Sequence, residues 1–225
     1  MGCRREWPSG RGRQQGTPAI LCFEVHRIKY LWAVVFVIVL VWSGLEPRDR
    51  ATWWLEVFPA IAGAMVLLFT YRRFRLTPLV YQLILLHCLV LMVGGHYTYA
   101  EVPFFDGWLG SERNNYDKLG HLFQGFVPAL IAREVLIRMQ AVNGRWWLRL
   151  FVVSLALAFS AFYELIEWWV ALVSEEAADA FLGTQGYVWD TQSDMALALV
   201  GAIGALALLS RVHDRQLRRL TTGGR

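Results

Sequence analysis

Long apolar runs alternate with short polar segments along most of this 225-residue chain. Each run is close to the ~20 residues that an α-helix needs to cross the hydrocarbon core of a bilayer. Several runs lack the polar stripe that a helix at the surface of a soluble core displays. The pattern predicts an all-α, polytopic membrane protein, a bundle of six transmembrane helices at about 28–45, 53–71, 77–97, 117–139, 147–172 and 190–210.

The two ends of the chain differ from this apolar middle. Residues 1–26 are basic, contain glycine and proline and show no periodicity, so we expect a flexible cytoplasmic tail. Residues 27–211 are predicted to form one six-helix transmembrane domain, and 212–225 a second basic tail. No small-residue cleavage site follows the first apolar run, which argues against a secretory signal peptide.

Composition supports a membrane protein and excludes several soluble classes. Hydrophobic residues make up 56% of the chain, mean hydropathy is +0.37, and several of the eleven tryptophans stand at the ends of apolar runs, as interfacial anchors do. The three cysteines are far apart and form no metal-binding pattern. No Walker A, GxGxxG, HExxH, GxSxG or EF-hand motif occurs, and no residue is predicted to bind an organic cofactor.

The basic residues predict the orientation of the bundle. With six spans, eighteen of the 22 Lys and Arg residues fall on the side that carries both termini. Cytoplasmic loops are enriched in Lys and Arg, so both the N- and C-termini are predicted to be cytoplasmic. The basic tails can contact anionic lipid, and they require no nucleic-acid partner.

Three pairs of ionisable residues interrupt the apolar pattern, each pair on one face of its predicted helix. The pairs are Asp117 with His121, Glu164 with Glu167, and Asp190 with Asp194. The fourth and sixth predicted helices begin at the outer side and the fifth ends there. The six side chains are therefore predicted to meet at one depth near the outer surface, with His96 as a further candidate.

This combination of residue types favours a divalent cation. Several carboxylates at membrane depth repel one another unless protons, water or cations neutralise them. One histidine with several carboxylates suits Zn²⁺, Mn²⁺ or Mg²⁺, and a bound metal is a known route to hydrolysis. The predicted ligands are His121, Glu164 and Asp194. The predicted general base, or group that orients the ligands, is Asp117, Glu167 or Asp190.

Three functional classes remain open from the residues alone. The first is a metal site that acts on a lipid-linked or other amphipathic substrate. The second is a proton-coupled transporter, which is disfavoured because the acidic residues stay near the outer ends of the predicted helices. The third is a non-catalytic structural or partner-binding protein, in which the polar residues only form hydrogen bonds between helices. The sequence leaves the oligomeric state and the question of enzymatic activity open.

Three smaller predictions concern isolated positions. His87 lies within an apolar run and is expected to be a core histidine with satisfied hydrogen bonds. His213 falls in the C-terminal tail and is expected to be solvated. The segment Gly201–Ala205 is rich in small residues, which favours close packing between helices.

Four blocks carry a resemblance to a known family. They are Tyr116–His121, Glu164–Trp168, Gly183–Gly186 and Trp189–Met195. In order and spacing they resemble the YjdF family of bacterial inner-membrane proteins, over about residues 28–210. The resemblance implies a multi-pass protein of the bacterial inner membrane and no particular reaction.

A more distant resemblance is to VanZ-like membrane proteins, which carry Asp-Lys-x-x-His, Glu-x-x-Gln and Asp-containing blocks. The matching residues here are Asp117, Lys118, His121, Glu164, Asp194 and Gly201. Glu167 replaces the glutamine of the second block, and Ala198 stands where an asparagine is usual. Both resemblances point to the same three blocks that the predicted topology brings together.

Overall fold

The structure is a computed structural model, and it describes residues 19–107, 113–173 and 187–222. Six helices account for most of these residues, and no β-strand occurs among them. The prediction of an all-α protein is confirmed. The helices are α1 (Ala19–Gly44), α2 (Arg50–Thr70), α3 (Pro78–His96), α4 (Tyr116–Arg138), α5 (Arg145–Val173) and α7 (Asp190–Thr222).

Local sequence signals define the starts of α2 and α3. Asp49 precedes α2 in an extended conformation, and its side chain accepts a hydrogen bond of 2.7 Å from the backbone N–H of Thr52. This is the usual N-cap arrangement, which satisfies one of the free donors at a helix start. Helix α3 begins at Pro78, and a proline is well tolerated there because the first helical N–H has no partner within the helix.

Two helices continue beyond their predicted ends. Helix α1 begins at Ala19 rather than near residue 28, and α7 continues to Thr222 rather than ending near residue 210. Neither extension contains glycine or proline, and both contain residues of good helix propensity. The predicted bounds followed the apolar pattern, which covers a shorter stretch of the chain than the helical backbone does.

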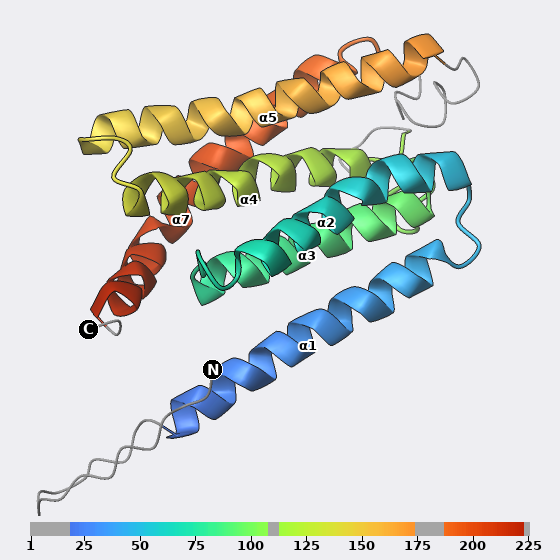
Figure 1. The fold of residues 1–225 in the computed structure, drawn as a ribbon. Coiled ribbons are helices and arrows are strands. Elements are labelled where there is room, and N and C mark those ends of the chain that lie inside the picture. The colour runs from blue at the N-terminus through green and yellow to red at the C-terminus, as the bar shows by residue number, and fades with distance from the viewer. Residues whose placement is uncertain (1–18, 108–112, 174–186, 223–225) are drawn as a thin grey trace, which may run out of the picture.

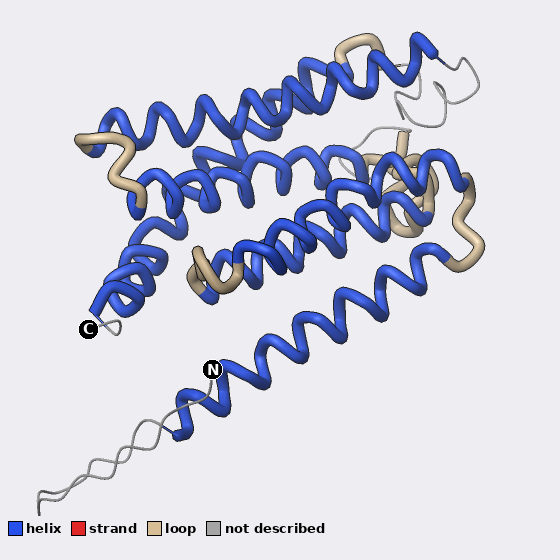
Figure 2. The backbone as a smooth tube through the Cα atoms, in the orientation of Figure 1, coloured by secondary structure: helices blue, strands red, loops and turns tan. Residues whose placement is uncertain are grey.

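Successive helices run in opposite directions, so the chain crosses the bundle once with each helix (Figure 1). The connections in the described part of the chain lie at the two ends of the bundle (Figure 2). Helix α4 packs against α3, α5 and α7, whereas α1 and α2 each pack mainly on α3. Helix α4 is therefore the central element, and α1 and α2 lie on one side of it.

The closest helix approach is between α4 and α7. Gly125 faces the backbone carbonyl of Ala198, and Gly201 faces the backbone carbonyl of Leu122. A side chain at either glycine would overlap the opposite backbone. The predicted close packing at Gly201 is confirmed, and its partner surface is α4.

The outer surfaces of the helices are apolar, as expected for contact with lipid. Leu68 and Phe69 of α2 are 74% and 78% exposed, while Val57 and Val80 are fully buried in the core beneath them. By length and composition α2, α3, α5 and α7 can each cross a membrane, and α1 contains a shorter apolar stretch, Tyr30–Gly44. The number of six membrane spans and the cytoplasmic location of both termini remain predictions.

Candidate functional site

The start of α4, the last half of α5 and the start of α7 meet at one end of the bundle (Figure 1). His121 lies at the centre of this junction. Its Nε2 is 3.3 Å from Asp117 Oδ1 and 4.0 Å from Asp194 Oδ2. Its Nδ1 is 3.6 Å from Glu164 Oε1. Side chains from three helices thus surround one buried imidazole.

A hydrogen bond to Gln124 orients this imidazole. His121 Nδ1 lies 2.8 Å from Gln124 Oε1, one turn further along α4. With the amide oxygen as acceptor, Nδ1 carries a proton. Nε2 faces the carboxylates of Asp117 and Asp194: a protonated ring donates to them, and a neutral ring offers a lone pair to a cation. Only a proton or a metal cation between these three groups makes the arrangement favourable.

The donor atoms of Asp117, His121 and Asp194 all lie within 4.8 Å of one another. His121 and Asp194 are buried, and Asp117 is partly exposed. Two carboxylate oxygens at this junction, Glu164 Oε1 and Asp194 Oδ1, are buried without a hydrogen-bond partner among the described residues. A buried oxygen of this kind carries an unrelieved desolvation cost, which a bound cation would offset.

Arg113 supplies positive charge beside the cluster. Its guanidinium is 2.5 Å from Asp190 Oδ1 and 3.9 Å from Asp117 Oδ2. The side chains of Arg113 and Asp190 are 9% and 8% exposed, so this ion pair is largely removed from solvent. The neighbouring Asn114 fixes the loop, because its amide donates to the backbone carbonyl of Val102 over 2.8 Å. Asp190 is thus held in an ion pair with Arg113.

Glu56 of α2 belongs to the same region, and sequence reasoning missed it. Its carboxylate is buried and accepts a 2.9 Å hydrogen bond from the hydroxyl of Tyr163 in α5. Glu56 has no ionisable partner three or four residues away, so the search for pairs on one helix face passed over it. The signal that identifies it is a lone carboxylate within an apolar run.

A cavity of about 920 Å³ extends from the cluster between α2, α4 and α5. Its polar lining includes Glu56, Asp117, His121 and Glu167, and apolar side chains line most of the rest. Helices α2 and α5 share no extensive contact. Aromatic side chains of these two helices line the cavity and are also more than half exposed on the outer surface: Trp54, Phe58, Phe159 and Phe162. The cavity therefore reaches the lipid-facing surface of the bundle.

Of the six predicted site residues, five are joined by direct contacts through His121 and Arg113. The sixth, Glu167, lines the cavity beside His121. His96, the further candidate, lies elsewhere. Its Nδ1 is 3.0 Å from the carbonyl of Ser43, and the centre of its ring is 4.6 Å from that of Trp42, so it contacts α1.

The prediction for His213 was wrong, and the prediction for His87 was right about its place in the core but wrong about its hydrogen bonds. His213 is fully buried rather than solvated, because α7 continues and packs against α4. Its Nε2 donates to Glu134 over 3.0 Å, and Arg133 contacts its Nδ1 at 3.1 Å. His87 is buried, but its Nε2 has no hydrogen-bond partner among the described residues. It lines the large cavity, where its neighbours are mainly apolar.

Comparison with known proteins identifies the family. The family described as "Predicted membrane protein (DUF2238)" matches residues 28–215, a segment that contains all six predicted site residues. The chain belongs to this family. It is 54% identical over 196 residues to inner membrane protein YjdF of Escherichia coli (strain K12), an alignment that covers 85% of this chain and 94% of that relative. No solved structure matches the chain.

Family membership confirms the predicted resemblance to the YjdF family and the predicted localisation. The protein is a multi-pass membrane protein, and its 54% identical relative is an inner-membrane protein by name. Neither description assigns a reaction. The function must therefore be argued from the site.

Proposed function

We propose that the protein binds a divalent cation between Asp117, His121 and Asp194, and that the cation acts on the polar group of a lipid-linked or other amphipathic substrate. The observation that carries this proposal is the convergence of one imidazole nitrogen and two carboxylates at a largely buried point. A soluble substrate would not require the apolar cavity that begins at the same point.

The dimensions of the cluster suit a cation. Two ligands that each lie about 2.1 Å from a metal are at most about 4.2 Å apart. The His121–Asp117 and His121–Asp194 separations of 3.3 and 4.0 Å already meet this limit. The widest separation in the cluster is within 4.8 Å, so it needs to shorten by at most about 0.6 Å. A rotation of one carboxylate is enough for that adjustment.

The contacts of His121 favour Asp117 over Glu164 as the third metal ligand, which differs from the roles predicted from the sequence. Asp117 faces Nε2 of the histidine and is better placed as a ligand than Glu164, which faces Nδ1. Gln124 orients the histidine from behind, as partners of metal-bound histidines commonly do. Glu167 lines the cavity and is the candidate general base, while Asp190 is engaged by Arg113.

The cavity indicates the kind of substrate. Its apolar walls lie between α2 and α5, and its polar part is formed by the carboxylates and His121. A molecule with a hydrocarbon chain and a phosphate or ester group would enter from the lipid between these two helices. The cation would polarise an oxygen of the polar group as a Lewis acid. Glu167 would then accept a proton from the attacking water.

Metal titration tests the first half of this proposal. The full-length protein is purified in detergent, treated with chelator and titrated with Zn²⁺ or Mn²⁺ by calorimetry. We expect one site in the wild type, and at least about 100-fold weaker binding in His121→Ala and Asp194→Asn. Gln124→Leu should retain the site with roughly 10- to 100-fold lower affinity, because only the orientation of the histidine is lost.

His96→Ala is the matched control, because this histidine lies at the same end of the bundle outside the cluster. It should bind metal as the wild type does. Circular dichroism and gel filtration establish that each variant is folded. Absence of Zn²⁺ and Mn²⁺ binding in the wild type, or wild-type affinity in His121→Ala, refutes the cation site.

The second half of the proposal, binding of an amphipathic substrate, is tested by filling the cavity. Gly63 lines it and has open space at its Cβ position, so Gly63→Phe should block the apolar part and leave the cluster intact. Lipids that co-purify with the wild type are identified by mass spectrometry. We expect the variant to lose a specific amphipathic species while it still binds metal. An unchanged lipid profile would refute an apolar substrate chain in this cavity.

A further inference from the structure

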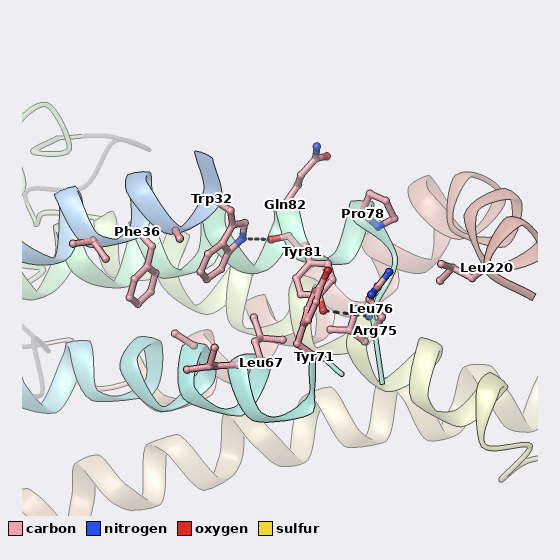
Figure 3. Close-up of a pocket in the computed structure, with 14 residues that line it drawn as sticks. Trp32, Phe36, Leu67, Tyr71, Arg75, Leu76, Pro78, Tyr81, Gln82 and Leu220 are labelled. Atoms are coloured by element: carbon pink, nitrogen blue, oxygen red, sulfur yellow. Dashed lines mark hydrogen bonds between the residues drawn. The ribbon is translucent and has the colours of Figure 1, made fainter. Parts of the chain in front are cut away.

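A second cavity lies on the opposite side of α2. Helices α1 and α2 both pack on α3 but share no extensive contact with each other, and a groove of about 520 Å³ remains between them. Figure 3 shows Phe36 towards one end of it and Arg75 towards the other. The lining between these ends is almost entirely apolar. Packing within the bundle therefore leaves this groove empty of side chains.

Fixed contacts hold the walls of the groove apart. The indole Nε1 of Trp32 donates a 2.9 Å hydrogen bond to the carbonyl of Tyr81, which ties α1 to α3 (Figure 3). The backbone N–H of Leu76 donates to the hydroxyl of Tyr81 over 3.4 Å, which ties the α2–α3 connection to the same tyrosine. Because both walls are attached to α3, the groove cannot close by a simple approach of α1 to α2.

Positive charge gathers at one end of the groove. Arg72, Arg73 and Arg75 follow α2 directly and are all exposed. Within the described residues none of the three forms an ion pair. Arg75 lines the groove, and its guanidinium lies over the ring of Tyr71 at 4.9 Å. A ligand in the groove would thus meet apolar walls along its length and arginines at its end.

We propose that this groove binds one acyl chain of an anionic phospholipid, with the headgroup phosphate at Arg75 and the other exposed arginines of the α2–α3 connection. Ala64 and Tyr71 are seven positions apart, or roughly 10 Å along α2, which accommodates part of one hydrocarbon chain. Basic pockets between membrane helices bind anionic headgroups, and this end of the bundle is the predicted cytoplasmic side. The site shares no lining residue with the cavity at the cation cluster.

Native mass spectrometry of the full-length protein in detergent tests the proposal. Phosphatidylglycerol and phosphatidylethanolamine with identical chains are added in turn. We expect the wild type to retain one phosphatidylglycerol and to prefer it over phosphatidylethanolamine. Arg75→Gln should weaken this binding roughly fivefold, and Arg72→Gln with Arg75→Gln roughly thirtyfold, since each basic residue near anionic lipid contributes about 1 kcal/mol.

Filling the groove tests the position of the chain. Ala64→Phe places a ring in the groove and should abolish the retained lipid. Val66→Phe is the matched control, because Val66 is on the same helix, is 59% exposed and does not line the groove. Arg75→Gln changes only an exposed side chain, so it decides the question even if Ala64→Phe fails to fold.

Three results would overturn the proposal. The first is equal retention of both lipids by the wild type, which indicates only a general lipid shell. The second is undiminished phosphatidylglycerol binding in both Arg75→Gln and Ala64→Phe. The third is a dimer of the wild type that Ala64→Phe dissociates while lipid binding is unchanged, because the groove would then hold a second copy of the chain. Each result is independent of metal binding at the cation cluster.

Discussion

Gly125→Ala tests how strongly the site depends on the contact between α4 and α7. A methyl group at this position would overlap the carbonyl oxygen, carbonyl carbon and Cα of Ala198. Those atoms belong to the α7 backbone and cannot rotate away as a side chain can. The two helices must therefore separate. Gly204 provides the matched control in α7, because a Cβ there meets nothing within 4 Å.

The expected magnitude follows from two opposing effects. Alanine is more favourable than glycine in a helix by up to about 1 kcal/mol, and this gain applies to both variants. Overpacking costs about 1–3 kcal/mol, and the upper part of that range applies at Gly125 because the clash is with backbone. We expect Gly125→Ala to lower the free energy of unfolding by about 2 kcal/mol and Gly204→Ala to raise it by up to about 1 kcal/mol.

Unfolding in mild detergent, followed by tryptophan fluorescence, measures this difference of about 3 kcal/mol between the variants. His121 and Asp194 lie on opposite sides of the same helix contact. Gly125→Ala should therefore also weaken Zn²⁺ binding, whereas Gly204→Ala should not. If Gly125→Ala is as stable as Gly204→Ala, the helices do not approach as closely as described and the reasoning fails.

Three further predictions concern single side chains. Asp49→Ala should lower the free energy of unfolding in urea by about 1 kcal/mol at pH 7. The hydrogen bond from the Thr52 N–H lowers the pKa of Asp49. The loss of stability should therefore persist at every pH above 3.8, the ordinary pKa of the side chain, and vanish as the pH falls through the lowered pKa. His213→Ala should lower the free energy of unfolding by about 3 kcal/mol, because buried Glu134 loses a donor, whereas a surface histidine would give no measurable change. His87→Leu should raise the midpoint of thermal unfolding, because it removes a buried nitrogen that has no hydrogen-bond partner among the described residues and so adds about 1 kcal/mol to the free energy of unfolding. A lower midpoint would show that this nitrogen does form a hydrogen bond in the folded protein.

Much of the architecture could be predicted because each membrane helix is recognisable from its own run of apolar residues. Apolar runs of sufficient length predicted the helices, and their alternating direction predicted that Asp117, Glu164 and Asp190 lie at the same end of the bundle. The contacts around His121 bear out that proximity. Spacing on one helix was sufficient for this inference because each pair of residues shares a helix face.

Other features depend on which helices become neighbours, and periodicity carries no such information. Glu56 reaches the site only because α2 and α5 face each other across the cavity, where Tyr163 bonds to it. The division of roles between Asp117 and Glu164 depends on the rotation of one imidazole, which Gln124 sets. His213 appeared to be a tail residue because apolar character ends before the helix does.

The two buried polar clusters also define a thickness. His121 and Glu134 are thirteen residues apart in α4, or roughly 20 Å, and Asp194 and His213 are nineteen residues apart in α7, or roughly 28 Å. Both spans are shorter than the ~30 Å hydrocarbon core of a typical bilayer. A thicker membrane would draw one cluster into hydrocarbon or force the lipid around it to thin, at fractions of a kcal/mol per ångström. We therefore expect longer acyl chains around the protein to act as a mechanical load on both clusters.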